Sequence, residues 1–236
     1  MSGAIFYRGQ SQIDGGPIVA IATNLTRKSK NEKTGDMIQT FFLRGDVNPF
    51  DAVMSGTDRS VCGNCPMRWK HGSIGACYVN VAKALCNVWQ AYKRGTYPWL
   101  EGKFVKKLKA KPLRLGTYGN PSSVPLAILK WITGESTGWT GYEHNWRTCD
   151  QRLKQLCMAS VESEEGMQEA IKKGWRTFRV KTETGVLLPK ESVCPASAER
   201  GHATNCASCL KCCGNARKGN VVINIHGRMR NKFEEE

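Results

Sequence analysis

The sequence predicts an α/β protein, a partial or complete βα barrel that carries two cysteine-rich loops. Runs of β-branched and aromatic residues alternate with segments of helical period about five times, which is typical of parallel strands joined by helices. A doubly wound sheet gives the same alternation, so both architectures stay open at this point. With no internal repeat or linker, we expect a single domain over residues 1–236, with cysteine loops at about 51–77 and 190–219.

The first half of the chain begins with two apolar strands, at 17–23 and 37–43, and the short polar loop between them favours a hairpin. Residues 51–75 are rich in glycine and polar residues, which predicts a loop. An amphipathic helix follows from Tyr78 and stops at Gly95. Its apolar face is formed by Val81, Leu85, Val88, Trp89 and Tyr92.

The second half alternates more regularly. Ser163 is expected to cap the helix that it begins, which has acidic residues in its first turn and lysines in its last. The predicted strands lie at 112–120, 139–145, 156–162, 175–181 and 220–227, and the predicted helices at 124–132, 145–155 and 163–174.

The chain is strongly basic, with 35 Lys and Arg against 20 Asp and Glu, a formal net charge of +15. Such an excess fits contact with nucleic acid, and it fits equally a basic protein without that partner. The densest run is Lys103 to Lys111, with five lysines in nine residues before Pro112. It would follow phosphates, or it would form the solvated face of a short helix.

Eleven cysteines, an odd number, and the lack of a leader-like N-terminus argue against a disulfide framework. A reducing, cytoplasmic setting follows, where clustered thiols bind metal or perform redox chemistry. No apolar stretch is long enough to span a membrane, so no membrane association is expected.

The C-terminal thiols have the spacing C-x11-C-x2-C-x2-C, formed by Cys194, Cys206, Cys209 and Cys212, with Cys213 as a substitute. Three thiols at two-residue spacing with a remote Cys-Pro favour a [4Fe-4S] cluster. Four thiolates also suit tetrahedral zinc, which stays as the alternative.

The N-terminal thiols are Cys62 and Cys65 in CGNCP, followed by Cys77. Three thiols on a cubane would leave one iron open to a substrate or cofactor. Cys86 would close the set into a four-cysteine zinc site, the other interpretation of this spacing. Cys149 and Cys157 have no paired spacing and are expected in the core.

The motifs CGNCP, CYVN, RLGTYGNP, TGYEHNW, MASVES, GWRTFRV, CPAS and CASCLKC, in this order, resemble the radical-SAM-like, cysteine-rich proteins encoded by tailed bacteriophages. The resemblance extends from about Asn31 to Gly227. It implies a βα barrel, an N-terminal cluster on Cys62, Cys65 and Cys77, and an auxiliary [4Fe-4S] cluster on the C-terminal thiols. It also implies S-adenosylmethionine as a cofactor, an electron donor as a partner, and the cytoplasm of an infected bacterium as the location.

In a βα barrel the ligand lies over the carboxyl ends of the strands. Residues predicted there include the catalytic candidates Asn120, His144 and His226, and the cofactor-binding candidates Tyr118, Gly119, Asn120, Ser160 and Arg179. Each has an ordinary structural alternative: a tight turn for Gly119 and Asn120, a core position for each histidine, an outward ion pair for Arg179.

Two functions are consistent with these patterns. One is an iron-sulfur enzyme with an unknown substrate. The other is a non-enzymatic protein, stapled by zinc or iron-sulfur centres, that binds DNA or RNA through its basic surface. The sequence has no G-x-S-x-G, H-E-x-x-H or Walker-type motif, which disfavours ordinary hydrolases, zincins and nucleoside triphosphatases.

Overall fold

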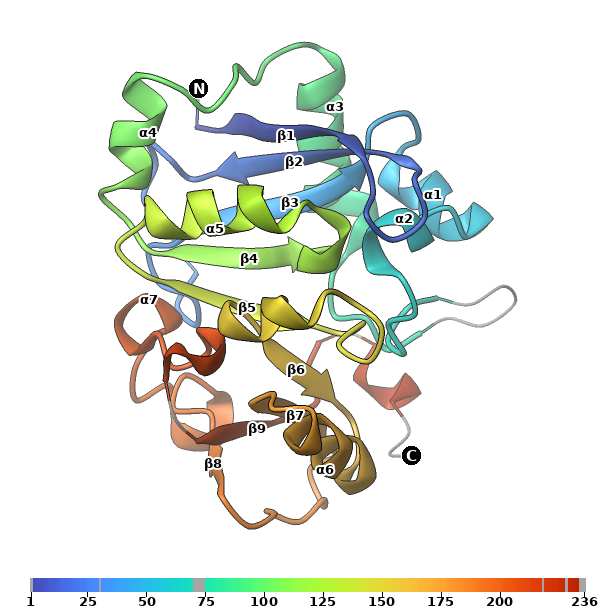
Figure 1. Ribbon diagram of the computed structural model, residues 1–236, viewed down its shortest axis with the longest axis vertical. Helices are drawn as coiled ribbons and strands as arrows, with labels where there is room; N and C mark the ends of the chain where they lie inside the picture. Colours follow the sequence, from blue (N-terminus) through green and yellow to red (C-terminus); the bar gives the residue numbers. More distant parts are fainter. Residues whose placement is uncertain (1, 30, 70–74, 218, 228, 234–236) are drawn as a thin grey trace.

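A computed structural model describes residues 2–29, 31–69, 75–217, 219–227 and 229–233 (Figure 1). These residues form an α/β fold around one nine-stranded sheet, in the order β1-β2-β3-β4-β5-β6-β7-β9-β8. The strands are β1 Ala4–Gln10, β2 Pro17–Thr23, β3 Ile38–Arg44, β4 Leu113–Tyr118, β5 Trp139–Glu143, β6 Met158–Val161, β7 Thr177–Lys181, β8 Glu191–Val193 and β9 Asn220–Asn224.

Helices and helical turns fill the connections. The α-helices are α1 Pro49–Ser55, α2 Arg59–Cys62, α3 Cys86–Lys93, α4 Lys103–Leu108, α5 Leu126–Gly134, α6 Glu164–Lys172 and α7 Cys206–Cys209. A π-helix, η1 Val81–Leu85, leads into α3, and the short 3-10 turns are η2 Pro121–Ser123, η3 Gln151–Gln155, η4 Ala198–Arg200, η5 Gly214–Ala216 and η6 Arg230–Lys232. None of the described helices has the length and apolar character that crossing a membrane requires.

The sheet is mostly parallel. β1, β2 and β3 pair antiparallel, which confirms the predicted hairpin of β2 and β3, and the pairs from β3 through β9 to β8 are parallel. Within the described residues, β1 and β8 form the two edges of the sheet and do not pair with each other. The strands therefore form an open sheet rather than a complete barrel.

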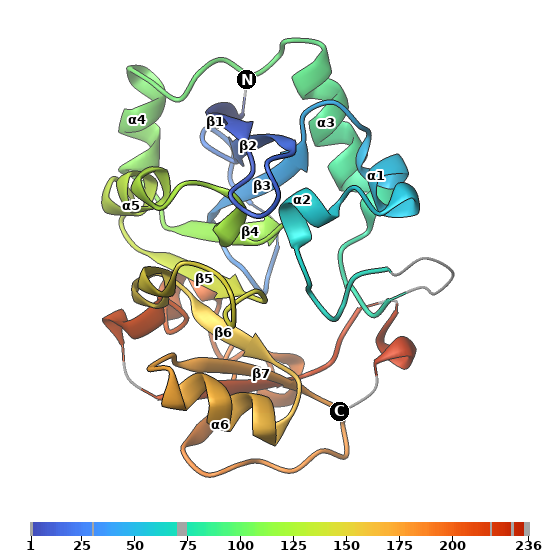
Figure 2. The same cartoon turned by 45° about the vertical axis from the view of Figure 1, so that its right-hand side comes forward.

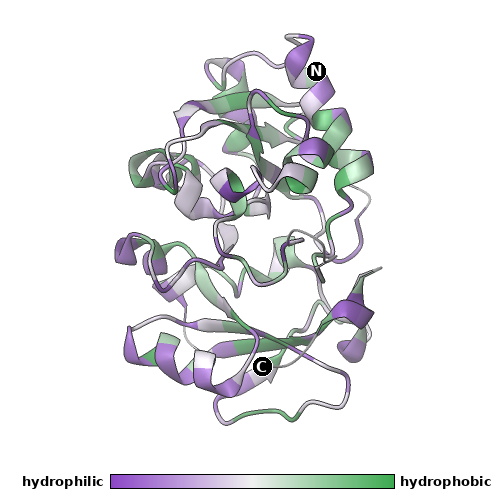
Figure 3. Cartoon of the chain, turned by 90° about the vertical axis from the view of Figure 1, so that its right-hand side faces the viewer, coloured by the Kyte–Doolittle hydropathy of each residue, from purple (hydrophilic) through white to green (hydrophobic). Residues whose placement is uncertain are grey.

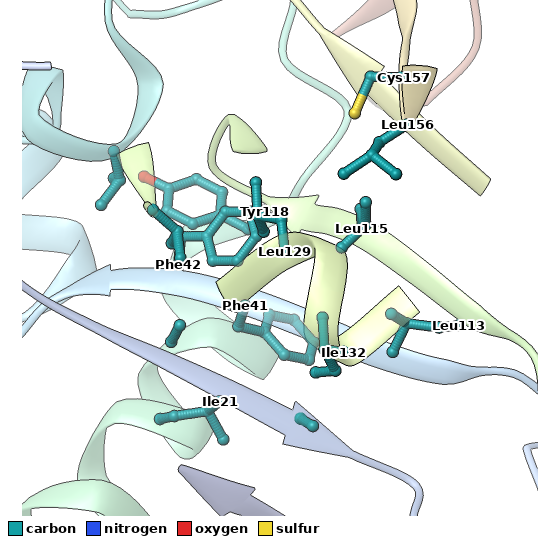
Figure 4. Close-up of a cluster of buried hydrophobic side chains, with 14 of the residues drawn as sticks. Ile21, Phe41, Phe42, Leu113, Leu115, Tyr118, Leu129, Ile132, Leu156 and Cys157 are labelled. Atoms are coloured by element: carbon teal, nitrogen blue, oxygen red, sulfur yellow. The ribbon is translucent and has the colours of Figure 1, made fainter. Parts of the chain in front are cut away.

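Apolar side chains cover both faces of this sheet. On one face, Leu129 and Ile132 of α5 pack over Phe41 and Leu113, as Figure 4 shows. On the other face of β6, Met158 packs with the C-terminal cysteine segment and with Val221 and Ile223 of β9. In Figure 3 the strands carry mainly hydrophobic colour, whereas α6 alternates between hydrophilic and hydrophobic colour.

Several predicted elements are confirmed. The helix face of Val81 and Leu85 is buried, and Val88 packs against the core. Ser163 caps α6, since its hydroxyl accepts a hydrogen bond from the Gly166 amide at 3.1 Å. The alternation of β4, α5, β5, β6, α6, β7 and β9 also follows the predicted order.

Other expectations were wrong. Residues 51–75 contain most of α1 and all of α2, because Asn48 caps α1 and Pro49 begins it. The helix expected over 145–155 is limited to η3, since Asp150 caps a new turn there and the preceding residues form turns. Strands β1 and β8 were not predicted; β1 alternates only at its outer end, and β8 has three residues.

Candidate functional site

One cavity of about 150 Å³ lies between the two cysteine segments, on the face of the sheet that bears Tyr142 and Phe178. It reaches the carboxyl ends of β4, β5, β6 and β9, which end at one edge because these strands are parallel (Figure 2). It is lined by Cys62, Cys65 and Cys77, by Cys194 and Cys206, and by the sequence candidates Tyr118, Gly119, Asn120, His144, Ser160 and His226. The fold thus brings together residues that are far apart in sequence.

The first thiol set is held by residues at the ends of other strands. α2 ends at Cys62, and Gly63 then turns the chain at φ +59°, where an added Cβ would lie 2.1 Å from the side-chain amide of Asn145. The amide of Asn64 donates to Asn145 Oδ1 at 2.8 Å. Asn120 Nδ2 donates to the carbonyl of Cys62 at 2.6 Å. Glycine at position 63 is therefore required by a close approach to the turn after β5.

Arg68 locks the same loop from its other side. Its guanidinium forms a bidentate pair with Asp58, the residue before α2, and donates to the carbonyl of Gly63 at 3.2 Å. Asp58 is 2% exposed, so this pair is shielded from solvent. Arg68 was not predicted from the sequence, where its only signal was its place in a cysteine-rich segment.

The first three thiols are close enough to interact. Burial, together with the neighbouring thiols of Cys62 and Cys77, raises the pKa of Cys65 well above its ordinary value. Burial and then the carboxylate of Asp58 raise the pKa of Cys62. A bound cation would reverse this preference for the neutral thiol, as metal coordination does for cysteine.

The second thiol set packs against β5 and the loop before β3. The Cys206 amide donates to the carbonyl of Lys33 at 2.9 Å, and Gly141 of β5 donates to the carbonyl of Cys212 at 2.8 Å. Burial raises the pKa of Cys212 to about 12. Burial also raises the pKa of Cys206, while the cations Arg114 and Lys33 act in the opposite direction.

The donor chemistry of both sets fits a thiophilic metal or an iron-sulfur cluster, since each offers three or four sulfur atoms in one locality. As the side chains lie, no three Cys, His, Asp or Glu of the described residues enclose a common point at ligand distance. The thiols would therefore turn toward a shared centre on binding. Cys86 takes no part, because its thiol donates to the carbonyl of Val81 and it does not line the cavity.

The hydrogen bonds of Asn120 fix the tautomer of His144. Because Asn120 Nδ2 donates to Cys62, its Oδ1 is the acceptor for His144 Nδ1, at 2.9 Å. His144 therefore carries its proton on Nδ1 and keeps a lone pair on Nε2. Burial lowers its pKa to about 4, so the imidazole is neutral at neutral pH.

Comparison with family models, with curated proteins and with solved structures finds no match for this chain. The chemistry of the site is therefore inferred from its own residues.

The remaining sequence candidates have different surroundings. His226 lines the cavity, but its Nε2 lies 2.9 Å from Lys33 Nζ and its Nδ1 lies 3.2 Å from the carbonyl of Asn224. Arg179 does not line the cavity; it forms a buried ion pair with Glu191. Cys157 is fully buried in the core and Cys149 packs against it, as expected. Cys213 is buried but does not line the cavity.

Lys33, Arg114 and Tyr142 also line the cavity, and they were not predicted from the sequence as site residues. Arg114 had a weak signal, because it is an arginine inside an otherwise apolar strand. Lys33 had none, since it lies in a polar loop with two other lysines nearby.

Glu143, at the end of β5, gives a pH prediction. It is 0% exposed, and burial raises its pKa from 4.5 to about 7, while three hydrogen bonds from Ser122 and Asn145 act in the opposite direction. The folded state holds this proton more tightly than the unfolded state. The resulting stability, up to about 3 kcal/mol, is fully present below about pH 4.5 and is lost as pH rises through about 7.

The test compares Glu143→Gln with the wild type by urea unfolding between about pH 4.5 and 8. The wild type is expected to lose free energy of unfolding relative to the variant as pH rises. The lowered pKa of His144 acts with the opposite sign, but it is common to both proteins and cancels in the difference. Parallel curves across this range would mean that Glu143 does not retain its proton.

Proposed function

We propose that this protein is an iron-sulfur protein, a radical-SAM-like enzyme whose open sheet serves as a partial βα barrel. One observation carries the proposal. Cys194 and Cys206 of the second set, with Cys206 beside Lys33 and Arg114, line the same cavity as the three thiols of the first set, which lie at the carboxyl ends of parallel strands. Ligand sites of parallel α/β proteins occur at this edge. The phage-protein resemblance of the motifs agrees with this arrangement.

In this proposal Cys62, Cys65 and Cys77 hold the first cluster, and Cys194, Cys206, Cys209 and Cys212 hold the auxiliary one. The separate hydrogen bonds of Cys86 favour three thiols over four in the first set. A bound cluster would supply or accept one electron.

The chain's own residues prepare the cavity for a substrate. His144 presents the Nε2 lone pair to a proton donor, and Asn120 holds the imidazole in that tautomer. Ser160 and Tyr118 are both buried at the cavity wall. The apolar side chains of Phe178 and Val180 keep water out. These roles suit a reaction in which an electron and a proton are transferred in a dry pocket.

The test is the iron and acid-labile sulfide content, with a visible spectrum, of protein purified without oxygen. We expect a brown protein with about eight irons and eight sulfides, the content of two cubanes. Added S-adenosylmethionine is expected to change its electron paramagnetic resonance spectrum. A colourless protein with about two zincs would contradict the proposal and favour the metal-stapled alternative.

A nucleic-acid interface is a second candidate, favoured by the exposed side of α4. Phe104 and Leu108 are buried, while Lys103, Lys106 and Lys107 are exposed. The other two lysines of the run form ion pairs within the protein: Lys109 with Glu135 at 3.1 Å and Lys111 with Asp36 at 2.9 Å.

For such an interface, replacing Lys103, Lys106 and Lys107 with glutamine is expected to reduce the slope of log affinity against log salt by about 2 to 3. The measurement is a fluorescence-anisotropy titration of duplex DNA and single-stranded RNA at several salt concentrations. Lys130→Gln, at an exposed position of α5, is the control for loss of one charge. An unchanged slope in the triple variant would remove α4 from consideration.

A further inference from the structure

Arg114 lies in the cavity wall and forms no ion pair with a carboxylate of the described residues. It is the second residue of β4, and its Cζ lies 6.0 Å from the ring centroids of both Tyr78 and Tyr142. One amino group donates to the Tyr78 hydroxyl. Its Nε is buried and has no hydrogen-bond partner among the described residues. The Nε–H of this guanidinium is therefore an unsatisfied donor.

Lys33 lies near Arg114 in the same cavity, and the two cations act on each other electrostatically. Its Nζ contacts Nε2 of His226 at 2.9 Å, and His226 Nδ1 in turn contacts the carbonyl of Asn224. An imidazole that donates from Nδ1 and accepts from the ammonium is neutral. His226 therefore positions Lys33 without neutralising its charge.

Neither cation forms an ion pair within 4 Å with a carboxylate of the described residues. Glu199 and the thiols of Cys194 and Cys206 act on Lys33 electrostatically, and the thiols of Cys206 and Cys212 act on Arg114 in the same way. Two neighbouring cations in a cavity with apolar walls repel each other, and the unsatisfied buried N–H of Arg114 Nε costs free energy. An anion between them would remove both penalties.

We propose that the cavity binds a small organic anion, with a phosphate or carboxylate group held between Arg114 and Lys33. Phe178, Val180 and Ile225 provide the apolar wall, and Tyr78 and Tyr142 flank the guanidinium.

This arrangement also orients the ligand. Arg114 lies near the start of β4, whereas Tyr118 and Asn120 lie at its end beside the first thiol set. An anionic group at Arg114 would direct the rest of the molecule toward Ser160 and His144. That this ligand is the substrate rests on the proposed function, whereas the anion site itself rests on the two cations.

The experiment is isothermal titration of the as-purified protein with phenyl phosphate and with benzoate, at fixed ionic strength in a buffer free of phosphate. We expect saturable binding of at least one probe, and the tighter one identifies the anionic group. Arg114→Gln and Lys33→Gln are each expected to weaken it by about ten- to hundredfold, the usual effect of losing a hydrogen bond to a charged group. Lys130→Gln removes the same charge from an exposed position of α5, outside the cavity, and is expected to leave binding unchanged.

Iron content and thermal midpoint are measured on the same samples. Arg114→Lys retains the positive charge as a compact ammonium group and is expected to weaken binding less than Arg114→Gln. It serves as the test variant if Arg114→Gln does not fold. Binding by an iron-free wild type would uphold the anion site while the proposed function fails. The anion site would be overturned if the wild type bound neither probe. It would also be overturned if the Arg114 and Lys33 variants lost iron but bound the probes as the wild type does, since the two cations would then be partners of the thiolates.

Discussion

For the proposed two-cluster protein, replacing Cys65 with alanine is expected to remove about half of the iron and sulfide, about four of each, and to leave the proposed auxiliary cluster in place. Cys65 lines the cavity beside Cys62 and Cys77, and its pKa responds to both thiols. Two remaining thiols would not hold a cubane. The paired variant Cys209→Ala is expected to remove the other half. The measurement is iron and sulfide per chain, with the visible spectrum of each variant.

Cys86→Ala is the matched control for this series. Its thiol donates to the carbonyl of Val81 and lies within 3.4 Å of Asn48 Oδ1, away from the cavity. We expect it to keep the full metal content. Loss of metal on replacing Cys86 would indicate a four-cysteine first site and would favour zinc over an open cluster.

Arg179→Met is expected to cause the largest loss of stability, about 3 to 5 kcal/mol in the free energy of unfolding. Arg179 and Glu191 are 5% and 0% exposed, and two contacts of 2.8 and 2.9 Å join them. Arg179 also donates to the carbonyl of Val186, and Glu191 accepts from the Leu188 amide. Removing the arginine leaves a buried carboxylate unpaired. Urea unfolding at pH 7 measures the loss.

Two comparisons test that explanation. The double variant Arg179→Met, Glu191→Leu is expected to recover much of the stability, because no buried charge remains. Arg152→Met breaks an exposed pair with Asp150 and is expected to change stability very little. Equal losses of stability in Arg179→Met and Arg152→Met would mean that the Arg179–Glu191 ion pair is solvated in solution.

The sequence predicts β4, β5, β6, β7 and β9, and it does so most clearly for β6 and β9, which bury nearly all of their residues as strands of a parallel sheet do. It fails where a cap or turn outweighs composition. Asn48 and Pro49 begin α1 inside a segment of loop-like composition, and the π-helix η1 precedes α3 without a sequence signal. The open edges of the sheet depend on strand pairing, which hydrophobic period does not encode.

The site was partly predictable for a similar reason. Tyr118, Gly119, Asn120, His144, Ser160 and His226 follow or end strands, and the parallel sheet brings them to the same cavity. Arg179 was misplaced relative to the cavity because adjacent strand residues face opposite sides, and Phe178 takes the cavity side. Lys33 and Arg114 could be assigned to the site only from the tertiary structure, because a loop residue and a strand residue some eighty positions apart come near each other only after folding.

The hydrogen bonds that hold the CGNC turn have a consequence for the biosynthesis of the protein. Cys62 is tied to Asn120, and Asn64 to Asn145, contacts that span 58 and 81 positions of the chain. On the ribosome, the first thiols emerge long before these asparagines. The loop therefore takes its final shape only after β4 and β5 have joined the sheet. Loading of the cluster proposed for Cys62, Cys65 and Cys77 would then follow folding of the chain rather than initiate it.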